Sequence, residues 1–422
     1  MRRLLSVTIF TGLLTFMKMC AGFIVSKVVA IYIGPSGLAM LGQIQNIVAL
    51  FNGLVNSPAG AGVVRFTSQN YDNGDISKCV PWWRASMRWC IIVSSLVIIS
   101  VIPFNKELSL WLFNDNSYSP VIIITALILP LTALGTMINS VINGQQKYRV
   151  FVSIGMISVI ISTAVMVILI MKFKVFGGLL AVSIQYGVIG FTSLLLCLRF
   201  AWVRPNYWFG KTSPDNMKHI FHYMLMAITS AFCLPLSLIL IRKILIFYVG
   251  WDLTGQWQAV WKISEAYLSV VTLALSTYFL PKLSKLTTYG EIKREITSTV
   301  LVIMPLIVIM GIFIYIMRDK IIFLLFTNDF IASISLFKYQ LCGDFIKILA
   351  WIFAYPLISQ GKVKWYITLE ILSAFLFVTL SFIFIQKLGL SGVFFFFFAY
   401  IVNYLFYFLF ILMNFKRIFK NI

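Results

Sequence analysis

The stretch TFMKMCAGFIVSKVVAIYIG, residues 15–34, has the length and apolar content of a helix that crosses a membrane. Lys18 and Lys27 interrupt it, and the stretch contains no acidic residue that could neutralise them. A charged side chain at the centre of a bilayer costs about 2.5–3.5 kcal/mol on insertion scales, so such residues usually serve a function. The stretch therefore predicts a membrane protein and marks a place to look for its binding site.

The rest of the chain continues this apolar pattern. Of its 422 residues, 60% are hydrophobic and only 11% are charged. Apolar runs near or above 18 residues recur along the whole length, as in proteins that cross the membrane many times. The first run is too long for a cleaved signal peptide and carries internal lysines. We therefore expect an all-α polytopic membrane protein.

Twelve membrane-spanning helices fit the sequence. The first six are expected at 4–33, 38–66, 80–103, 119–143, 148–171 and 178–201. The second six are expected at 218–249, 254–284, 296–317, 332–359, 365–386 and 390–414. Short polar stretches such as GPSG at 34–37 and YDNGD at 71–75 supply turns between them.

The distribution of Lys and Arg gives an orientation to these helices. If both termini are cytoplasmic, 21 of the 34 basic residues fall on the cytoplasmic side and eight, including Arg242, fall on the opposite side. Cytoplasmic loops of membrane proteins carry such an excess of positive charge. The net charge of +21 is therefore explained by membrane topology, and no nucleic-acid partner is required.

The chain divides near its midpoint into two halves. A polar connector at 203–218 separates an expected N-terminal lobe, 1–203, from a C-terminal lobe, 218–422, with a cytoplasmic linker at 204–217. The similar motifs GQIQ at 42–45 and GQWQ at 255–258 open the second helix of each lobe. This placement favours a duplicated fold of six plus six helices with a binding site between the lobes.

The N-terminal half carries basic residues in its helices without acidic partners. No Asp or Glu precedes Asp72, and none lies between residues 116 and 214. Lys18 lies too deep to reach the membrane surface easily, so it is expected to face a hydrated cavity or to pair with Glu265 or Asp344 of the other half. Lys27 and Arg65 are candidates for the same cavity, with the alternatives of snorkelling and of anchoring the topology.

Three asparagines in the same half are candidate ligands for hydroxyl-rich groups. Asn46 and Asn52 lie on the second expected helix, and Asn139 lies on the fourth. Their amides could donate and accept hydrogen bonds in a cavity. Hydrogen bonding between helices is an equally good explanation for each of them.

The C-terminal half carries acidic residues inside its helices. Two pairs, Lys262 with Glu265 and Asp344 with Lys347, have the i,i+3 spacing at which helical side chains meet. Glu370 has no such local partner. These pairs either neutralise each other locally or include a carboxylate that takes up and releases a proton during transport. Glu265, Asp344 and Glu370 are therefore candidates for proton coupling or gating, with Lys262 and Lys347 as charge partners.

The sequence lacks the motifs of several other classes of protein. The six cysteines are scattered without a CxxC pair, the chain has two histidines, and neither a Walker motif nor a metal-ligand cluster occurs. No cofactor, metal or built-in ATPase is therefore expected. A basic cavity lined by amides suits an anion with many hydroxyls, and a lipid carrying a sugar on a diphosphate meets that description.

Several stretches also resemble a known family. They include KMCAGFIVSKVVAIYIGPSGL at 18–38, YDNG at 71–74, WDLTGQWQAVWKISEAYL at 251–268, YFLPKLSKL at 278–286 and YQLCGDFIKILAWIFAY at 339–355. In order and spacing, the chain resembles the Wzx flippases over roughly residues 4–415. This group comprises O-antigen translocases and the lipid III flippase of enterobacterial common antigen.

The resemblance implies a fold and an activity. It implies two six-helix lobes in a V shape around a central cavity, as in the multidrug and oligosaccharidyl-lipid exporter superfamily, which includes the MATE transporters. It implies movement of undecaprenyl-diphosphate-linked oligosaccharide from the cytoplasmic to the periplasmic leaflet of the bacterial inner membrane, driven by the proton gradient. It also implies a polysaccharide polymerase and a chain-length regulator as partners.

A flippase is not an enzyme, so no catalytic site is expected. Two other functions are alternatives to it. A cation-coupled multidrug exporter of the same fold would hold cationic drugs with acidic residues in its first half, and this chain has none in its expected N-terminal helices. A membrane polymerase or ligase acting on the same sugars would have a large periplasmic loop with essential arginines. The longest outer loops expected here, 104–118 and 318–331, are short.

Overall fold

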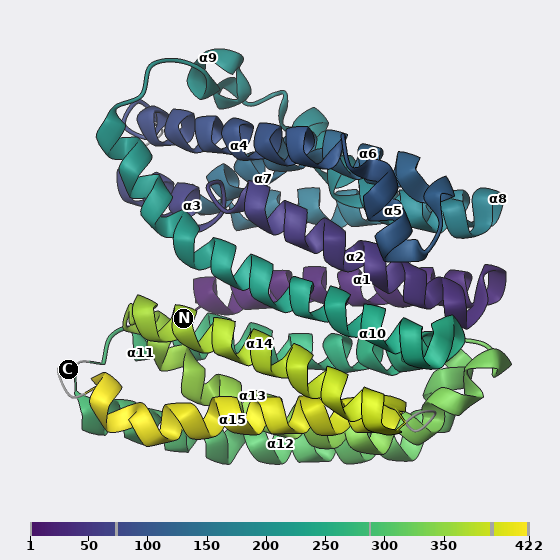
Figure 1. The fold of residues 1–422 in the computed structure, drawn as a ribbon. Coiled ribbons are helices and arrows are strands. Elements are labelled where there is room, and N and C mark those ends of the chain that lie inside the picture. The colour runs from purple at the N-terminus through teal and green to yellow at the C-terminus, as the bar shows by residue number, and fades with distance from the viewer. Residues whose placement is uncertain (1, 72–74, 287, 389–391, 420–422) are drawn as a thin grey trace. The chain divides into compact units, whose positions relative to one another are not determined.

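The computed structural model describes residues 2–71, 75–286, 288–388 and 392–419. Figure 1 shows that these residues form long helices that lie alongside one another within each part of the chain. The expectation of an all-α fold is confirmed. Most of the turn expected at 71–75 lies outside the described residues.

The chain forms two compact units. The N-terminal unit comprises residues 1–32 and 40–236, and the C-terminal unit comprises 33–39 and 237–422. The division lies inside one long helix, α10 (Pro214–Ala274), rather than in the connector at 204–217. The first turns of α10 belong to the N-terminal unit because Ile220 and Met224 are buried against Ala85.

The N-terminal unit contains nine helices, apart from residues 34–39 of the second one, and the start of α10. They are α1 (Arg2–Tyr32), α2 (Gly34–Asn56), α3 (Ala61–Asn70), α4 (Val80–Val101), α5 (Asn105–Phe113), α6 (Ser119–Leu127), α7 (Leu129–Gly144), α8 (Tyr148–Cys197) and α9 (Pro205–Trp208). The second expected helix is divided between α2 and α3, because Pro58 and Gly60 lie at the break. The fourth is divided between α6 and α7 just before Pro130.

The C-terminal unit contains the rest of α10 and the helices that follow it. They are a π-helical turn (Leu275–Phe279), α11 (Leu280–Leu283), α12 (Tyr289–Leu325), the 3₁₀ segment η4 (Asn328–Leu336), α13 (Phe337–Ser359), α14 (Val363–Leu388) and α15 (Gly392–Phe419). Helix α15 packs against both α13 and α14, and Figure 1 shows the three running alongside one another.

Ten helices of the described chain are long and apolar enough to cross a membrane. Two of them are interrupted by a residue with positive φ, α8 at Lys174 (φ 48°) and α10 at Gly250 (φ 82°). A helix of 50 residues spans about 75 Å, more than twice the hydrocarbon core of a bilayer. Each interrupted helix therefore supplies two spans, which accounts for the twelve that the sequence predicts.

Close helix contacts hold the N-terminal unit together. Gly135 of α7 lies against Gly190 of α8, and a methyl group on either glycine would overlap the backbone of the other helix. Small residues of this kind let the backbones of membrane helices approach closely. On α1, Leu14 is buried against Val152 and Val159 of α8.

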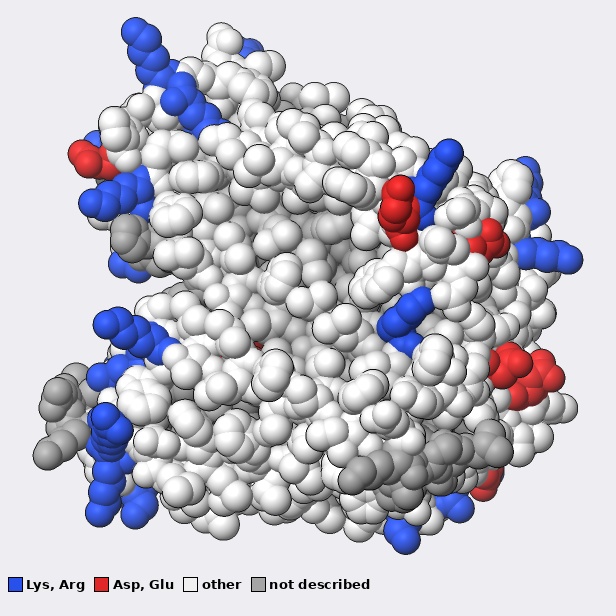
Figure 2. Space-filling model, viewed as in Figure 1, with Lys and Arg blue, Asp and Glu red and all other residues white. Residues whose placement is uncertain are grey.

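The charged residues are arranged as in a membrane protein. Figure 2 shows Lys and Arg at both ends of the helices on the visible face, Asp and Glu mostly at one of these ends, and mainly uncharged surface between the ends. In the C-terminal unit the exposed basic residues include Lys285 and Lys293 after the π-helical turn and Arg417 at the end of α15. This separation of charge from apolar surface is what the bilayer requires.

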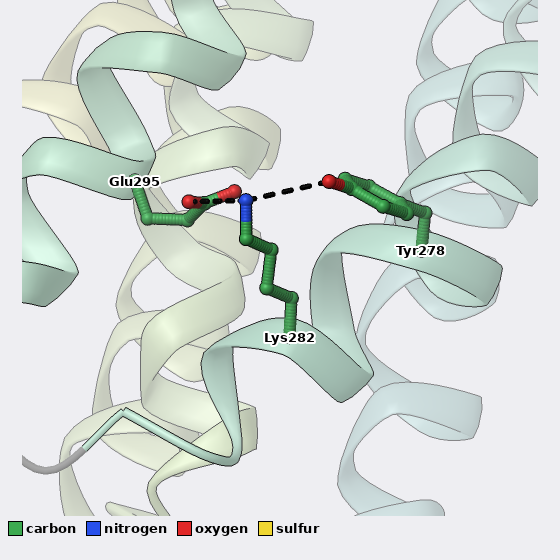
Figure 3. Close-up of polar contacts among 3 residues, drawn as sticks. All are labelled: Tyr278, Lys282 and Glu295. Carbon is green, nitrogen blue, oxygen red and sulfur yellow. Dashed lines mark hydrogen bonds and ion pairs between the residues drawn. The ribbon is translucent and has the colours of Figure 1, made fainter.

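An ion pair links α11 to α12 in the C-terminal unit. Lys282 Nζ lies 2.7 Å from Glu295 Oε2 and 3.3 Å from the hydroxyl of Tyr278, and Figure 3 shows it pointing between them. The Lys282 side chain is 44% exposed. A pair this accessible to water contributes little to stability.

Candidate functional site

A buried carboxylate lies at the centre of the C-terminal unit. Asp344 of α13 has no exposed surface. It accepts four hydrogen bonds, from Tyr267 Oη at 2.5 Å, Ser264 Oγ at 2.6 Å, Gln340 Nε2 at 2.8 Å and Tyr400 Oη at 2.8 Å. A carboxylate has about four lone-pair positions for such bonds, so the protein supplies a full set of neutral donors.

Three helices bring these donors together. Ser264 and Tyr267 lie three residues apart on the second half of α10, so they point from one face of that helix. Tyr400 comes from α15, and its ring passes beside Gly343, the neighbour of Asp344 on α13. A methyl group at Gly343 would overlap Cδ1 of the Tyr400 ring, so the missing side chain makes room for this donor.

Lys347 lies one turn further along α13 and is surrounded by aromatic rings. Its ammonium lies 4.9 Å from the ring centre of Trp351, 5.2 Å from Trp261, 5.6 Å from Tyr404 and 5.7 Å from Tyr400. Ammonium groups within about 6 Å of an aromatic face are attracted to it, by up to about 2 kcal/mol when water is excluded. Lys347 is only 4% exposed, so these rings replace most of its hydration.

The spacing of Asp344 and Lys347 would allow an ion pair, but the structure gives each side chain other partners. Asp344 is held by hydroxyl and amide donors, and Lys347 is held by rings. Gln340 and Trp351 belong to α13 itself, whereas the other partners come from α10 and α15. Tertiary contacts of this kind cannot be read from spacing along one helix.

Two further carboxylates are linked to the same group of aromatic residues. Glu265 is exposed and accepts a hydrogen bond of 2.8 Å from Trp261 Nε1, whose ring faces Lys347. Glu370 of α14 is half-buried and accepts one of 2.9 Å from the hydroxyl of Tyr407. Lys262, the expected partner of Glu265, is half-buried on the same segment of α10.

One face of α15 was missed by the sequence analysis. Tyr400, Tyr404 and Tyr407 are buried and lie at intervals of four and three residues, so they share that face. Through their hydroxyls or rings they contact Asp344, Lys347 and Glu370. The periodic tyrosines in an otherwise Phe-rich run are the signal that could have identified them.

Arg242, one of the basic residues expected on the outer side of the membrane, is buried in the protein. It is only 1% exposed within α10. Its Nη2 donates a hydrogen bond of 2.6 Å to Gln258 Oε1, and its guanidinium lies 5.4 Å from the ring centre of Trp257. Gln258 belongs to the GQWQ motif, and the polar partner explains why a buried arginine is tolerated there.

The basic candidates of the N-terminal unit have different environments. Lys18 is exposed on α1, and it has no hydrogen bond or ion pair with any residue that the structure describes. Lys27 is half-buried on the same helix, and Arg65 is exposed on α3. The membrane spans of this unit contain no Asp or Glu, so Lys18 lies in a helix whose neighbours along the sequence offer no counter-charge.

The asparagines of this unit are only partly satisfied. Asn139 Nδ2 donates to Ser193 Oγ at 3.4 Å, which links α7 to α8. Within the described chain, Asn46 Nδ2 and Asn52 Oδ1 are buried without a hydrogen-bond partner. These two amides of α2 therefore keep hydrogen-bonding capacity for water or a ligand.

The structure thus joins the C-terminal candidates into one network. Asp344, Lys347, Glu265 and Glu370 are connected through tyrosines and tryptophans on α10, α13 and α15. The candidates Lys18, Lys27, Arg65, Asn46, Asn52 and Asn139 belong to the N-terminal unit. Among the residues that the structure describes, no group of three or more His, Cys, Asp or Glu side chains could hold a metal ion.

Comparison of the sequence with known proteins identifies several relatives. Residues 4–287 match the family described as "Polysaccharide biosynthesis protein". The chain is 26% identical over 374 residues to the lipid III flippases of Escherichia coli (strain K12) and Shigella flexneri. Each alignment covers 87% of this chain and 88% of the relative.

Comparison of the structure with solved structures identifies transporters of the same fold. An inward-facing multidrug resistance MATE family transporter of the MOP superfamily has a TM-score of 0.72, and an outward-facing one has 0.63. Both are 16% identical, and the alignments cover 98% and 99% of this chain and 99% and 97% of the transporters. A MOP superfamily transporter from Pyrococcus furiosus has a TM-score of 0.60, at 16% identity over 98% of this chain and 96% of its own.

These comparisons decide two of the expectations. The MATE-like fold is confirmed by the solved structures. The relatives are flippases and transporters, which confirms the expectation that the chain is not an enzyme.

Proposed function

The chain belongs to the polysaccharide biosynthesis protein family, and on that premise we propose that it flips a lipid-linked oligosaccharide across the bacterial inner membrane. The lipid III flippases that it resembles support this class of substrate. In the finer proposal, the substrate is an undecaprenyl-diphosphate-linked repeat unit, of an O-antigen or a related polysaccharide. It moves from the cytoplasmic to the periplasmic leaflet.

The observation that carries the proposal is the charge of the N-terminal spans. They contain Lys18 and Lys27 and no carboxylate. Lysines in spans that contain no Asp or Glu give this region a positive charge that attracts a phosphate and repels a cationic substrate. In the proposal Lys18, Lys27 and Arg65 attract the diphosphate, and the amides of Asn46, Asn52 and Asn139 hydrogen-bond the sugars.

The C-terminal network is proposed to couple transport to the proton gradient. Its three carboxylates range from exposed Glu265 through half-buried Glu370 to fully buried Asp344. A proton arriving at Asp344 would convert one acceptor oxygen into a donor and force its four donors to rearrange. Such a rearrangement of α10, α13 and α15 is the step that we assign to alternating access, with Lys262 and Lys347 as the nearby charges.

A cation-coupled multidrug exporter is the second candidate, because the solved structures of this fold include multidrug MATE transporters. An exporter of cationic drugs benefits from acidic residues in its binding cavity. The N-terminal spans of this chain have none, so the flippase is the better-supported proposal.

The proposal also includes the setting of the protein in the cell. The excess of Lys and Arg in the expected cytoplasmic loops supports cytoplasmic positions for both termini. A substrate delivered to the periplasmic leaflet must then be polymerised, so a polysaccharide polymerase and a chain-length regulator are the proposed functional partners.

A complementation experiment tests the function. The chain is expressed in cells that lack their own flippase but make a defined lipid-linked unit, and the amount of that sugar on the cell surface is measured. We expect restored surface sugar and no increase in resistance to cationic dyes. Dye resistance without surface sugar would replace the flippase by the exporter.

A further inference from the structure

Asp344 has no exposed surface, so a proton can reach it only through neighbouring side chains. Two carboxylates linked to its network are open to water, because Glu265 is exposed and Glu370 is half-buried. Each accepts one hydrogen bond from an aromatic side chain, Glu265 from Trp261 and Glu370 from Tyr407. These two aromatic groups differ in whether they can pass a proton on, and this difference identifies the route to Asp344.

The link from Glu265 ends at an indole. An indole N–H can only donate, so it cannot accept a proton and release another, whereas a phenol hydroxyl does both. Trp261 therefore holds Glu265 without opening a path from it to Asp344. The Tyr407 hydroxyl donates to Glu370 Oε1 at 2.9 Å and can accept a proton at its own oxygen. The path that can carry a proton thus begins at Glu370.

Three buried tyrosines of α15 lie between Glu370 and Asp344. Tyr407 is bonded to Glu370, and Tyr400 donates to Asp344 Oδ1 at 2.8 Å. Tyr404 lies between these two on the same helix face. Its ring centre is 5.0 Å from that of Tyr400 and 6.5 Å from that of Tyr407. The three phenols therefore form a line enclosed by protein, with a carboxylate at each end.

The hydroxyl of Tyr404 interrupts this line. It has no hydrogen-bond partner among the residues that the structure describes, although both Asp344 and Glu370 lie close enough to interact with it electrostatically. The Tyr404 ring is held against Tyr400 and lies 5.6 Å from Lys347 Nζ. A hydroxyl that is not committed to one partner can turn toward either neighbour, so Tyr404 is placed to close or open the line.

We propose that the three tyrosines of α15 conduct protons between Glu370 and Asp344, and that Tyr404 controls this transfer. The proposal rests on the proton coupling proposed above. A protonated Glu370 donates its proton to Tyr407, and each phenol then passes its own proton to the next oxygen until Asp344 Oδ1 is protonated. Every tyrosine oxygen gains one proton and loses one, so Glu370 ends as the carboxylate and Asp344 as the acid. The reverse sequence releases the proton.

The titratable groups around this line come from three helices. They are Asp344 and Lys347 of α13, Tyr267 and Glu265 of α10, and Glu370 and Tyr366 of α14. The Lys347 ammonium lies beside two of the phenol rings and disfavours a second positive charge on either of them, so the proton does not rest on a tyrosine. Tyr267 also donates to Asp344, but it has no hydrogen bond to a second carboxylate within the described chain.

The test follows the protonation of Asp344 by infrared spectroscopy of the purified full-length chain after a rapid drop in pH. A protonated-carboxyl band that is absent from Asp344→Asn, and that shifts when aspartate is isotopically labelled, reports this residue. The labelling assigns the band even if the variant does not fold. We expect Tyr404→Phe to slow the appearance of the band by at least about tenfold without changing its final size, because positioned groups speed proton transfer by large factors. Glu370→Gln should slow it as well.

A matched variant separates the relay from a structural role. Tyr339→Phe removes a hydroxyl from a half-buried tyrosine of α13 whose ring also stacks on α15, and it should leave the rate unchanged. Tyr404→Phe removes a hydroxyl that has no partner in the described chain, so a purely structural role predicts no change in rate. An unchanged rate in Tyr404→Phe would therefore overturn the relay, and so would slowing by Tyr267→Phe alone.

The same measurements separate the relay from the function on which it rests. No Asp344 band at any pH would overturn both the relay and the proposed proton coupling. A slowed band in Tyr404→Phe, together with a wild-type chain that fails to restore surface sugar in the complementation experiment, would overturn the flippase and support the relay.

Discussion

The two units handle charge inside the membrane in opposite ways. The N-terminal spans hold basic residues without acids, and Lys18 stays exposed without a partner among the described residues. The C-terminal spans hold both signs, and each buried charge has protein partners, such as the four donors around Asp344 and the rings around Lys347. A charge without a protein partner is suited to bind a ligand. A charge with protein partners is suited to a stable structure whose conformation changes when the charge is neutralised.

The C-terminal arrangement also shows that buried opposite charges need not pair. Asp344 and Lys347 lie one turn apart on α13, yet each is stabilised by neutral groups. Because Asp344 and Lys347 have neutral partners, the two charges are not held together in one ion pair. A proton that binds Asp344 therefore does not have to break such a pair. The comparison with the N-terminal unit leads to four predictions, in order of decreasing effect.

The largest effect is expected from reversing the charge of Lys18 in the N-terminal unit. Lys18→Glu should reduce surface sugar in the complementation assay by at least about tenfold, because a carboxylate would repel the diphosphate. Lys18→Arg keeps the charge and should retain most of the activity. Normal surface sugar from Lys18→Glu, at equal amounts of protein in the membrane, would remove Lys18 from the binding site.

The second largest effect is expected from removing the hydrogen-bonded carboxylate of Asp344 in the C-terminal unit. Asp344→Ala leaves four buried donors without an acceptor and should lower the free energy of unfolding by about 3–5 kcal/mol. Thermal unfolding of the purified protein in detergent measures this change. Asp319→Ala, an exposed carboxylate outside the network, should change stability by less than about 0.5 kcal/mol. Equal stability of the two variants would show that the donors around Asp344 find other partners.

A smaller effect is expected from crowding the same network without touching a charge. Gly343→Ala places a methyl group against the Tyr400 ring and should cost about 1–3 kcal/mol, as overpacking does in other cores. Gly311→Ala is the matched control, because open space surrounds that glycine of α12. It should be neutral or stabilising by up to about 1 kcal/mol. If both substitutions behave alike, the position of Tyr400 does not depend on Gly343.

The smallest effect is expected at the water-exposed ion pair of the C-terminal unit. Lys282→Ala removes the contact with Glu295 and should lower the free energy of unfolding only slightly, and less at high salt, because water and ions screen an exposed pair. A double-mutant cycle with Glu295→Ala isolates the pair, and Lys285→Ala controls for loss of an exposed lysine. A coupling energy as large as the effect of Asp344→Ala would contradict the distinction between exposed and buried charges.

Most of the fold could be predicted from the sequence because the bilayer restricts the possible structures. Apolar length and basic loops were enough to predict twelve spans, and the breaks at Lys174 and Gly250 lie in or beside the expected gaps between spans. The division of the expected helix 119–143 into α6 and α7 was not predicted. The proline at position 130 is compatible with one kinked helix or two shorter ones, and local sequence does not decide between them.

The candidate site was less accessible from the sequence. Asp344, Glu265 and Glu370 could be found because carboxylates in apolar helices are rare. Their tyrosine partners could not be found, because Tyr400 is 56 residues from Asp344 and Tyr407 is 37 residues from Glu370. The burial of Arg242 could not be predicted for the same reason, since only the folded chain brings Gln258 to it.

Tyr400 has a consequence for how this protein can be dissected by mutation. Its hydroxyl is bonded to Asp344, while its ring forms one wall around Lys347. Any rotation of that phenol therefore alters both charges together, and the two residues are thermodynamically coupled although they form no ion pair. The effects of substituting Asp344 and Lys347 on stability will not be additive. A phenotype from either substitution reports on Asp344, Lys347 and Tyr400 together.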